Sequence, residues 1–203
     1  MLIPLFPLGN ALFPDGVIHL RIFEVRYLDM IKKCIAEQRE FGIVPLLAGR
    51  EVRTPEGTEI LASAGTMARI DEWSAPMPTL LQLRCSGTRR FQLSSTQLGK
   101  FGLWTGDATF MEADPVVAIP DTLRPATDAL GKLIADLQQS EVPQEQMPLA
   151  PPFRLDEAGW VANRWCELLP VPAAQKQALL EMPDPTQRLE LVQEYMADRG
   201  LLR

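Results

Sequence analysis

The sequence has very little histidine and cysteine. Its 203 residues include a single histidine, His19, and three cysteines, Cys34, Cys85 and Cys166. These residues are too few and too widely spaced to supply the clustered ligands of a zinc site, so we expect no metal site. An odd number of cysteines instead indicates reduced thiols, buried as small apolar side chains, in a cytoplasmic protein.

Long apolar runs and an excess of basic charge are also missing. No run of about 18 apolar residues occurs, so we expect no membrane-spanning helix. The first residues do not form a basic segment followed by an apolar one and a cleavage site, so we expect no secretory signal. The formal net charge is −6, with 12 basic and 13 acidic residues in 1–118 and 8 and 13 in 119–203. Phosphate contacts require basic side chains, so nucleic acid and anionic membranes are poor partners.

Motifs for catalysis are absent as well. The sequence contains neither a G-x-S-x-G elbow nor an H-E-x-x-H pair. Gly99-Lys100 is followed by Phe101, and no glycine stands five positions before Gly99, so there is no Walker A loop. His19 lies in a predicted strand, and we interpret it as a strand histidine that is either at the surface or hydrogen-bonded. The sequence therefore predicts a protein without catalytic residues, metal or cofactor.

The first 40 residues carry the clearest pattern of elements. A short apolar run at 2–6 is followed by Asp15-Gly16, a pair typical of turns. A β-prone run at 17–22 comes next. Leu28, Ile31 and Ile35 then recur at helical spacing, which predicts a helix over 24–38. Strand, turn, strand and helix indicate a folding nucleus and not an active site.

The pattern changes near residue 118. Gly65 lies inside a β-prone run, which indicates a bulge or a bend. After Pro120 the apolar residues take helical spacing, and Asp184-Pro185 is typical of a helix start. We expect an α+β fold with a small β-barrel over 1–118 and a helical bundle over 119–203. The expected strands are 2–6, 17–22, 41–47, 59–73, 80–85, 90–93 and 101–111, with a loop at 74–79 and a turn at 87–88; the expected later helices begin near 123, 156, 173 and 184.

Two arginines with apolar sequence neighbours, Arg21 and Arg90, are candidate binding residues. An arginine in a barrel strand most often extends its charged end to the solvent or pairs with a nearby acid such as Glu24, and otherwise it contacts a ligand. Pairing within the protein is the favoured interpretation, and ligand contact is the alternative.

A second candidate group is apolar. Phe13, Trp73, Met77 and Leu80 lie in or beside predicted loops. Methionine and aromatic side chains on loops suit recognition of varied apolar partners, although burial in the core is the favoured interpretation.

Several segments occur in an order that resembles a known family. P-L-F-P-L at 4–8, L-F-P at 12–14 and R-I-F-E-V-R-Y at 21–27 begin the series, and segments at 42–46, 65–70, 87–91, 176–181 and 188–190 follow. Together they resemble the N-terminal substrate-binding domain of Lon proteases, above all the small bacterial proteins that consist of this domain alone. Val25 stands where the family usually has proline, and His19 stands where it often has proline or valine.

The resemblance implies a PUA-like β-barrel followed by a C-terminal helical bundle. It also implies a non-catalytic module that binds unfolded or extended polypeptide segments, as an adaptor in protein quality control. The ATPase and the Ser-Lys protease of Lon are not in this sequence. A small-ligand or RNA-binding PUA-like protein is the alternative, and the acidic charge balance disfavours RNA. An unrecognised hydrolase would have to rely on His19.

Overall fold

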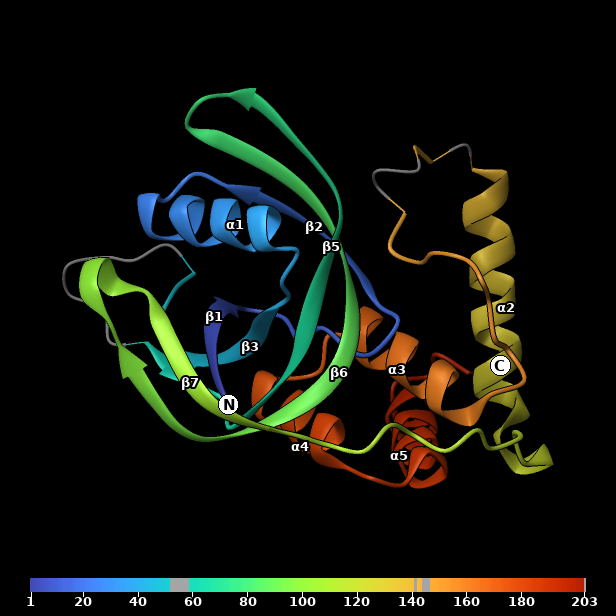
Figure 1. Ribbon diagram of the computed structural model, residues 1–203. Helices are drawn as coiled ribbons and strands as arrows, with labels where there is room; N and C mark the ends of the chain where they lie inside the picture. The colour runs from blue at the N-terminus through green and yellow to red at the C-terminus, as the bar shows by residue number, and fades with distance from the viewer. Residues whose placement is uncertain (52–58, 141, 144–146, 203) are drawn as a thin grey trace.

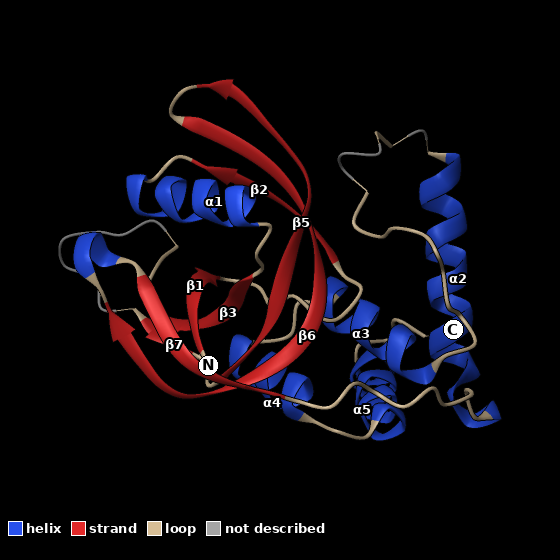
Figure 2. Ribbon diagram, in the orientation of Figure 1, coloured by secondary structure: helices blue, strands red, loops and turns tan. Residues whose placement is uncertain are grey.

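The structure is a computed structural model that describes residues 1–51, 59–140, 142–143 and 147–202. In these residues seven strands and five α-helices form a mixed α+β fold, as Figures 1 and 2 show. The strands are β1 Leu2–Leu8, β2 Val17–Ile22, β3 Phe41–Ala48, β4 Ile60–Leu61, β5 Ala64–Met77, β6 Leu80–Leu98 and β7 Trp104–Phe110. The helices are α1 Val25–Glu37, α2 Arg124–Gln139, α3 Ala158–Leu168, α4 Ala173–Glu181 and α5 Pro185–Asp198, with short 3-10 turns η1 Lys100–Gly102 and η2 Asp121–Leu123.

The strands form one sheet in the order β1-β7-β6-β5-β3-β4, and β2 pairs with β6 outside this path. Strand neighbours are antiparallel except β1 and β3, which pair in parallel. β1 uses residues 2–5 to pair with β7 and residues 5–8 to pair with β3. The pairings therefore return from β3 to β1 in a ring. The α+β class is confirmed; the PUA-like barrel stays a prediction, which this ring of pairings supports.

Three apolar clusters hold the elements together. One, which includes Leu5 and Phe91, joins strands of the ring, and a second, which includes Ile31, packs α1 on the sheet. The third cluster, which we call the helical core, joins the four helices from α2 through α5. These helices lie together beside the sheet in Figure 1. Ala11 and Phe13, from the loop between β1 and β2, belong to this third cluster. The boundary that we predict near residue 118 falls between β7 and η2, but the apolar core crosses it.

Two predicted connections in the sheet are wrong. The expected loop at 74–79 is the end of a hairpin, because β5 continues to Met77 and β6 begins at Leu80. The expected turn at Gly87-Thr88 lies inside β6. A Cβ atom at Gly87 would lie 2.2 Å from the Phe13 carbonyl oxygen. The glycine therefore permits the β1–β2 loop to approach the strand closely, and it does not form a turn.

The observed starts of α3 and α5 agree only in part with those predicted from the sequence. Asp184 caps α5, since its Oδ1 accepts a hydrogen bond from the Thr186 N–H at 2.8 Å. Pro185 takes the first helical position, where its missing N–H does no harm. The predicted cap of α3 at Asp156 is wrong, because α3 begins after Glu157 and no side chain caps it.

Candidate functional site

A cleft of about 410 Å³ lies between the end of β1 and β2, and we call it the β1–β2 cleft. Residues 6–8 line one wall and the consecutive residues 18–24 line the other, with Tyr27 of α1 and Glu51 completing it. Successive side chains of a strand point to opposite faces. A cleft bordered by consecutive residues therefore runs along the edge of β2.

Strand edges without a partner border this cleft on both sides. β2 pairs with β6 over Val17 to Ile22, and no other strand pairs with β2 among the described residues. The β1 edge that pairs with β7 over residues 2–5 has no strand of the described chain beside it at 6–8. Such edges present backbone N–H and C=O groups that can pair with another chain.

Arg21 lines the cleft, is exposed, and has no carboxylate partner among the described residues. Glu24 pairs instead with Arg26, at 3.1 Å between Oε2 and Nη2. Glu51 accepts a hydrogen bond from the Gly9 N–H at 2.6 Å. Glu24 is therefore not the partner of Arg21, and both acids of the cleft already have partners.

The loop that leads into β2 is anchored on α3 by a buried carboxylate. Glu167 Oε1 accepts from the Phe13 N–H at 2.8 Å, and Glu167 Oε2 lies 3.0 Å from Arg164 Nε. Arg164 Nη2 also donates to the Pro14 carbonyl at 2.7 Å. A Cβ atom at Gly16 would overlap the Glu167 carboxylate, so the close contact requires glycine there. These contacts fix the position at which β2 begins.

The electrostatics of this anchor follow from burial. Burial raises the pKa of Glu167 to about 7, although Arg164, the Phe13 N–H and Lys176 act in the opposite direction. Burial lowers the pKa of Lys176, whose Nζ donates to Asn10 Oδ1 at 2.6 Å. The anchor is therefore a polar cluster closed by internal hydrogen bonds.

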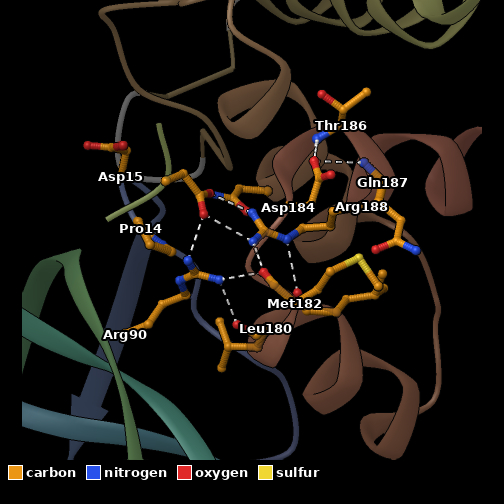
Figure 3. Close-up of polar contacts among 12 residues, drawn as sticks. Pro14, Asp15, Arg90, Leu180, Met182, Asp184, Thr186, Gln187 and Arg188 are labelled. Carbon is orange, nitrogen blue, oxygen red and sulfur yellow. Dashed lines mark hydrogen bonds and ion pairs between the residues drawn. The ribbon is translucent and has the colours of Figure 1, made fainter. Parts of the chain in front are cut away.

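Arg90, from β6, lies away from the cleft, at the junction with the helices. Its Nη1 donates to the carbonyls of Leu180 at 2.8 Å and Met182 at 2.9 Å, as Figure 3 shows. Its Nη2 donates to Asp114 Oδ1 at 2.6 Å and to the Glu112 carbonyl at 3.3 Å. Burial, with a contribution from nearby Arg188, lowers the pKa of Arg90, while Asp114 raises it. The side chain is 3% exposed, and its donors are taken up by groups of the protein itself.

Arg188, from α5, binds the same carboxylate from the other side. Its Nη1 lies 2.6 Å from Asp114 Oδ2, and its Nε donates to the Leu179 carbonyl at 2.9 Å. Arg188 Nη2 donates to the Met182 carbonyl, which also accepts from Arg90 (Figure 3). Asp114 thus connects a strand arginine with a helix arginine, and sequence reasoning missed it because the three residues are far apart in the chain.

Of the four predicted apolar contact residues, two are buried and two are exposed. Phe13 is fully buried in the helical core, and Leu80 is buried as well, so neither side chain offers a surface to a ligand. Trp73 and Met77 are each 54% exposed. Both lie on the hairpin of β5 and β6, which extends as a curved arm past α1 in Figure 1.

The sequence analysis also missed the cleft. The signal for it is Pro7, because proline lacks a backbone N–H and within sheets is confined to edges, first positions and bulges. Phe23, which follows β2 and lines the cleft, is 54% exposed. Its exposure continues the alternation of β2, in which His19 and Arg21 are exposed while Leu20 and Ile22 are buried, although its apolar side chain alone indicates burial.

Other chemistry is not indicated by the described part of the chain. No group of histidine, cysteine, aspartate and glutamate there could hold a metal ion. None of the helices described is both long and apolar enough to cross a membrane. All three cysteines are buried and unpaired, and burial raises the pKa of Cys85 and of Cys166 to about 12.

Comparison with known proteins identifies the family. The profile of the ATP-dependent protease La (LON) substrate-binding domain matches residues 2–198. The crystal structure of a Lon N-terminal domain protein from Xanthomonas campestris is similar, with a TM-score of 0.73 and 28% identity over 96% of this chain and 98% of that one. The N-terminal domain of the Mycobacterium avium complex Lon protease shares the fold, with a TM-score of 0.60 and 20% identity over 98% and 99%. No curated protein matches. The predicted family is thus confirmed, and the chain belongs to the family of the Lon substrate-binding domain.

Proposed function

We propose that the protein is a non-catalytic module that binds unfolded or extended polypeptide segments. The family supports substrate binding. The observation that carries the proposal is the exposure of Trp73 and Met77 on the hairpin that extends past α1. Large apolar side chains presented together on a projecting element offer area that an unfolded chain can cover.

The expected affinity is weak. Burial of a few hundred Å² of apolar surface contributes several kcal/mol at about 25 cal/mol per Å², before the costs of association are subtracted. The dissociation constant should then be about micromolar or higher. Such an affinity suits a module that samples many chains and releases them.

The test is a titration with a permanently unfolded protein, reduced and carboxymethylated α-lactalbumin, at low and high salt. Binding should survive high salt, because apolar burial is not screened, and should weaken about tenfold or more in a Trp73→Ala, Met77→Ala double variant. A Val116→Ala, Leu191→Ala double variant is the control, since it removes exposed apolar side chains outside the hairpin. Absence of binding by the wild type, or its loss in high salt alone, would refute the proposal.

The wider role that we propose is that of an adaptor in cytoplasmic protein quality control in bacteria. Three buried, unpaired cysteines support a reducing compartment. A second candidate is small-ligand binding, which the volume of the β1–β2 cleft favours, because it falls within the usual range of ligand pockets. RNA binding has less support, given the net charge of −6.

A further inference from the structure

We propose that the β1–β2 cleft binds a segment of extended polypeptide as an added strand on the edge of β2, and that Arg21 selects an acidic side chain in that segment. This inference rests on the proposed function. It adds the conformation of the bound segment, the surface that receives it and the chemistry that it must carry.

The backbone of β2 supplies the first argument. Residues 18–24 line the cleft consecutively, so the cleft follows the strand edge. β6 occupies the opposite edge of β2 over the whole strand. At about 3.3 Å per residue, the six residues of β2 present an edge about 20 Å long, which can pair with about six residues of an extended chain. Addition of a strand to such an edge satisfies backbone groups of both chains, whatever the side chains are.

The charges of the cleft supply the second argument. Its two acids are engaged, Glu24 by Arg26 and Glu51 by the Gly9 N–H. Arg21 is exposed and has no such partner among the described residues. The cleft therefore has one positive charge that is not neutralised, in a protein whose net charge is negative. An aspartate or glutamate in the added strand complements this charge.

The register of the sheet connects the cleft with the apolar hairpin. Leu20 of β2 pairs with Leu83 of β6, which pairs in turn with Trp73 of β5. Trp73 thus lies two strands away from β2, about 10 Å at the usual strand spacing. At the end of β2, Ile22 pairs with Leu81, which is adjacent to the hairpin turn. One extended chain can therefore occupy the cleft and contact the hairpin.

The backbone test uses a fluorescent nine-residue peptide of alternating threonine and valine with a central aspartate. Two further versions carry N-methyl groups on alternate residues, one version for each edge of the peptide. Methylation along the peptide edge that faces β2 should weaken binding about tenfold or more, because it removes the N–H donors that pair with β2. Methylation along the opposite edge of the peptide should change the affinity less than twofold. If neither version binds more weakly than the parent, strand addition is refuted.

The charge test compares the aspartate peptide with its asparagine counterpart. The wild type should prefer aspartate about threefold to fivefold, as one exposed ion pair allows. Arg21→Gln should abolish the preference. Arg124→Gln, which removes the same charge from the exposed start of α2, should keep it. A preference that persists in Arg21→Gln would overturn the role of Arg21.

The outcomes separate this inference from the proposed function. If carboxymethylated α-lactalbumin binds through the hairpin while neither peptide test gives the expected result, strand addition fails and the proposed function stands. If the wild type binds neither the unfolded protein nor the peptide, both fail.

Discussion

Glu167 is a carboxylate whose burial makes the stability of the protein depend on pH. In the folded protein its pKa is raised from 4.5 to about 7, chiefly by burial. Between pH 4.5 and about 7, Glu167 therefore keeps its proton in the folded state and has released it in the unfolded state. Stability from this group is therefore fully present below about pH 4.5 and is lost as the pH rises through about 7.

Glu167→Gln should remove this dependence, because the amide stays neutral and its oxygen can still accept from the Phe13 N–H. Relative to the variant, the wild type should lose up to about 3 kcal/mol of unfolding free energy between pH 4.5 and 8. Urea denaturation at a series of pH values measures this difference. The prediction fails if the difference in unfolding free energy between wild type and variant stays constant from pH 4.5 to 8, or if it shifts in favour of the wild type as the pH rises. Either result would show that Glu167 is ionised in the folded protein over this whole range.

At the scale of elements, two glycines have opposite roles. Gly87 lies in β6, where an added Cβ would be 2.2 Å from a backbone oxygen of Phe13. The β1–β2 loop would have to move, and with it the start of β2. Gly131 lies inside α2, where an added Cβ would meet Leu155 at an ordinary 3.5 Å.

Gly87→Ala should therefore destabilise the protein by about 2 kcal/mol, the usual cost of overpacking. Gly131→Ala should stabilise it by about 0.5 to 1 kcal/mol, since alanine favours helix more than glycine does. Thermal unfolding should show a midpoint lower by about 4–8 °C for the first variant and higher by about 2 °C for the second. Equal effects of the two substitutions would contradict this assignment of roles.

The elements that local patterns determine were predictable from the sequence. Turn residues at 15–16 and helical spacing at 28–35 located β2 and α1, and Asp184-Pro185 located the start of α5. The hairpin was mistaken for a loop because Pro76 and Pro78 suggest an interruption. β5 in fact continues to Met77 with a register shift between Ser74 and Met77, and Pro78 lies in the turn. The local sequence does not show that a strand can continue past a proline through such a register shift.

The candidate site was less predictable, because it depends on contacts between distant segments. Burial of Phe13 is set by the helices on which it packs, and Trp73 is exposed because it lies on the projecting hairpin of β5 and β6 (Figure 1), and neither follows from the neighbouring residues in sequence. The cleft depends on which edge of β1 pairs with β3 over residues 5–8. The spacing of apolar residues in the sequence cannot indicate which edge is used. Glu24, the acid near Arg21 in sequence, pairs with Arg26 in the structure, a choice that the sequence does not show.

At the scale of the whole molecule, a buried ionic cluster joins the strands to the helices. Arg90 from the sheet and Arg188 from α5 share Asp114, which lies between β7 and η2. Arg90 also donates to the carbonyls of Leu180 and Met182 at and just beyond the end of α4. Together with Phe13 in the helical core, this cluster makes the two parts depend on each other.

Arg90→Ala should therefore destabilise the sheet and the helices together. The substitution removes the Arg90 donor from the carbonyl of Leu180 and one of the two arginine donors from that of Met182. It also removes one of the two cations on Asp114, a change that costs about 3 kcal/mol in buried pairs. In a background with Trp73→Phe and Trp104→Phe, which leaves only the tryptophans of α3, Trp160 and Trp165, the midpoint of thermal unfolding should fall by about 10 °C, equally by circular dichroism and by tryptophan fluorescence. Arg69→Ala, which removes an exposed ion pair with Asp71, should shift it by no more than about 3 °C. If Arg90→Ala leaves the midpoint unchanged, the guanidinium is not part of the framework; if only one of the two signals shifts, the strands and helices unfold separately and the boundary near residue 118 separates independent domains.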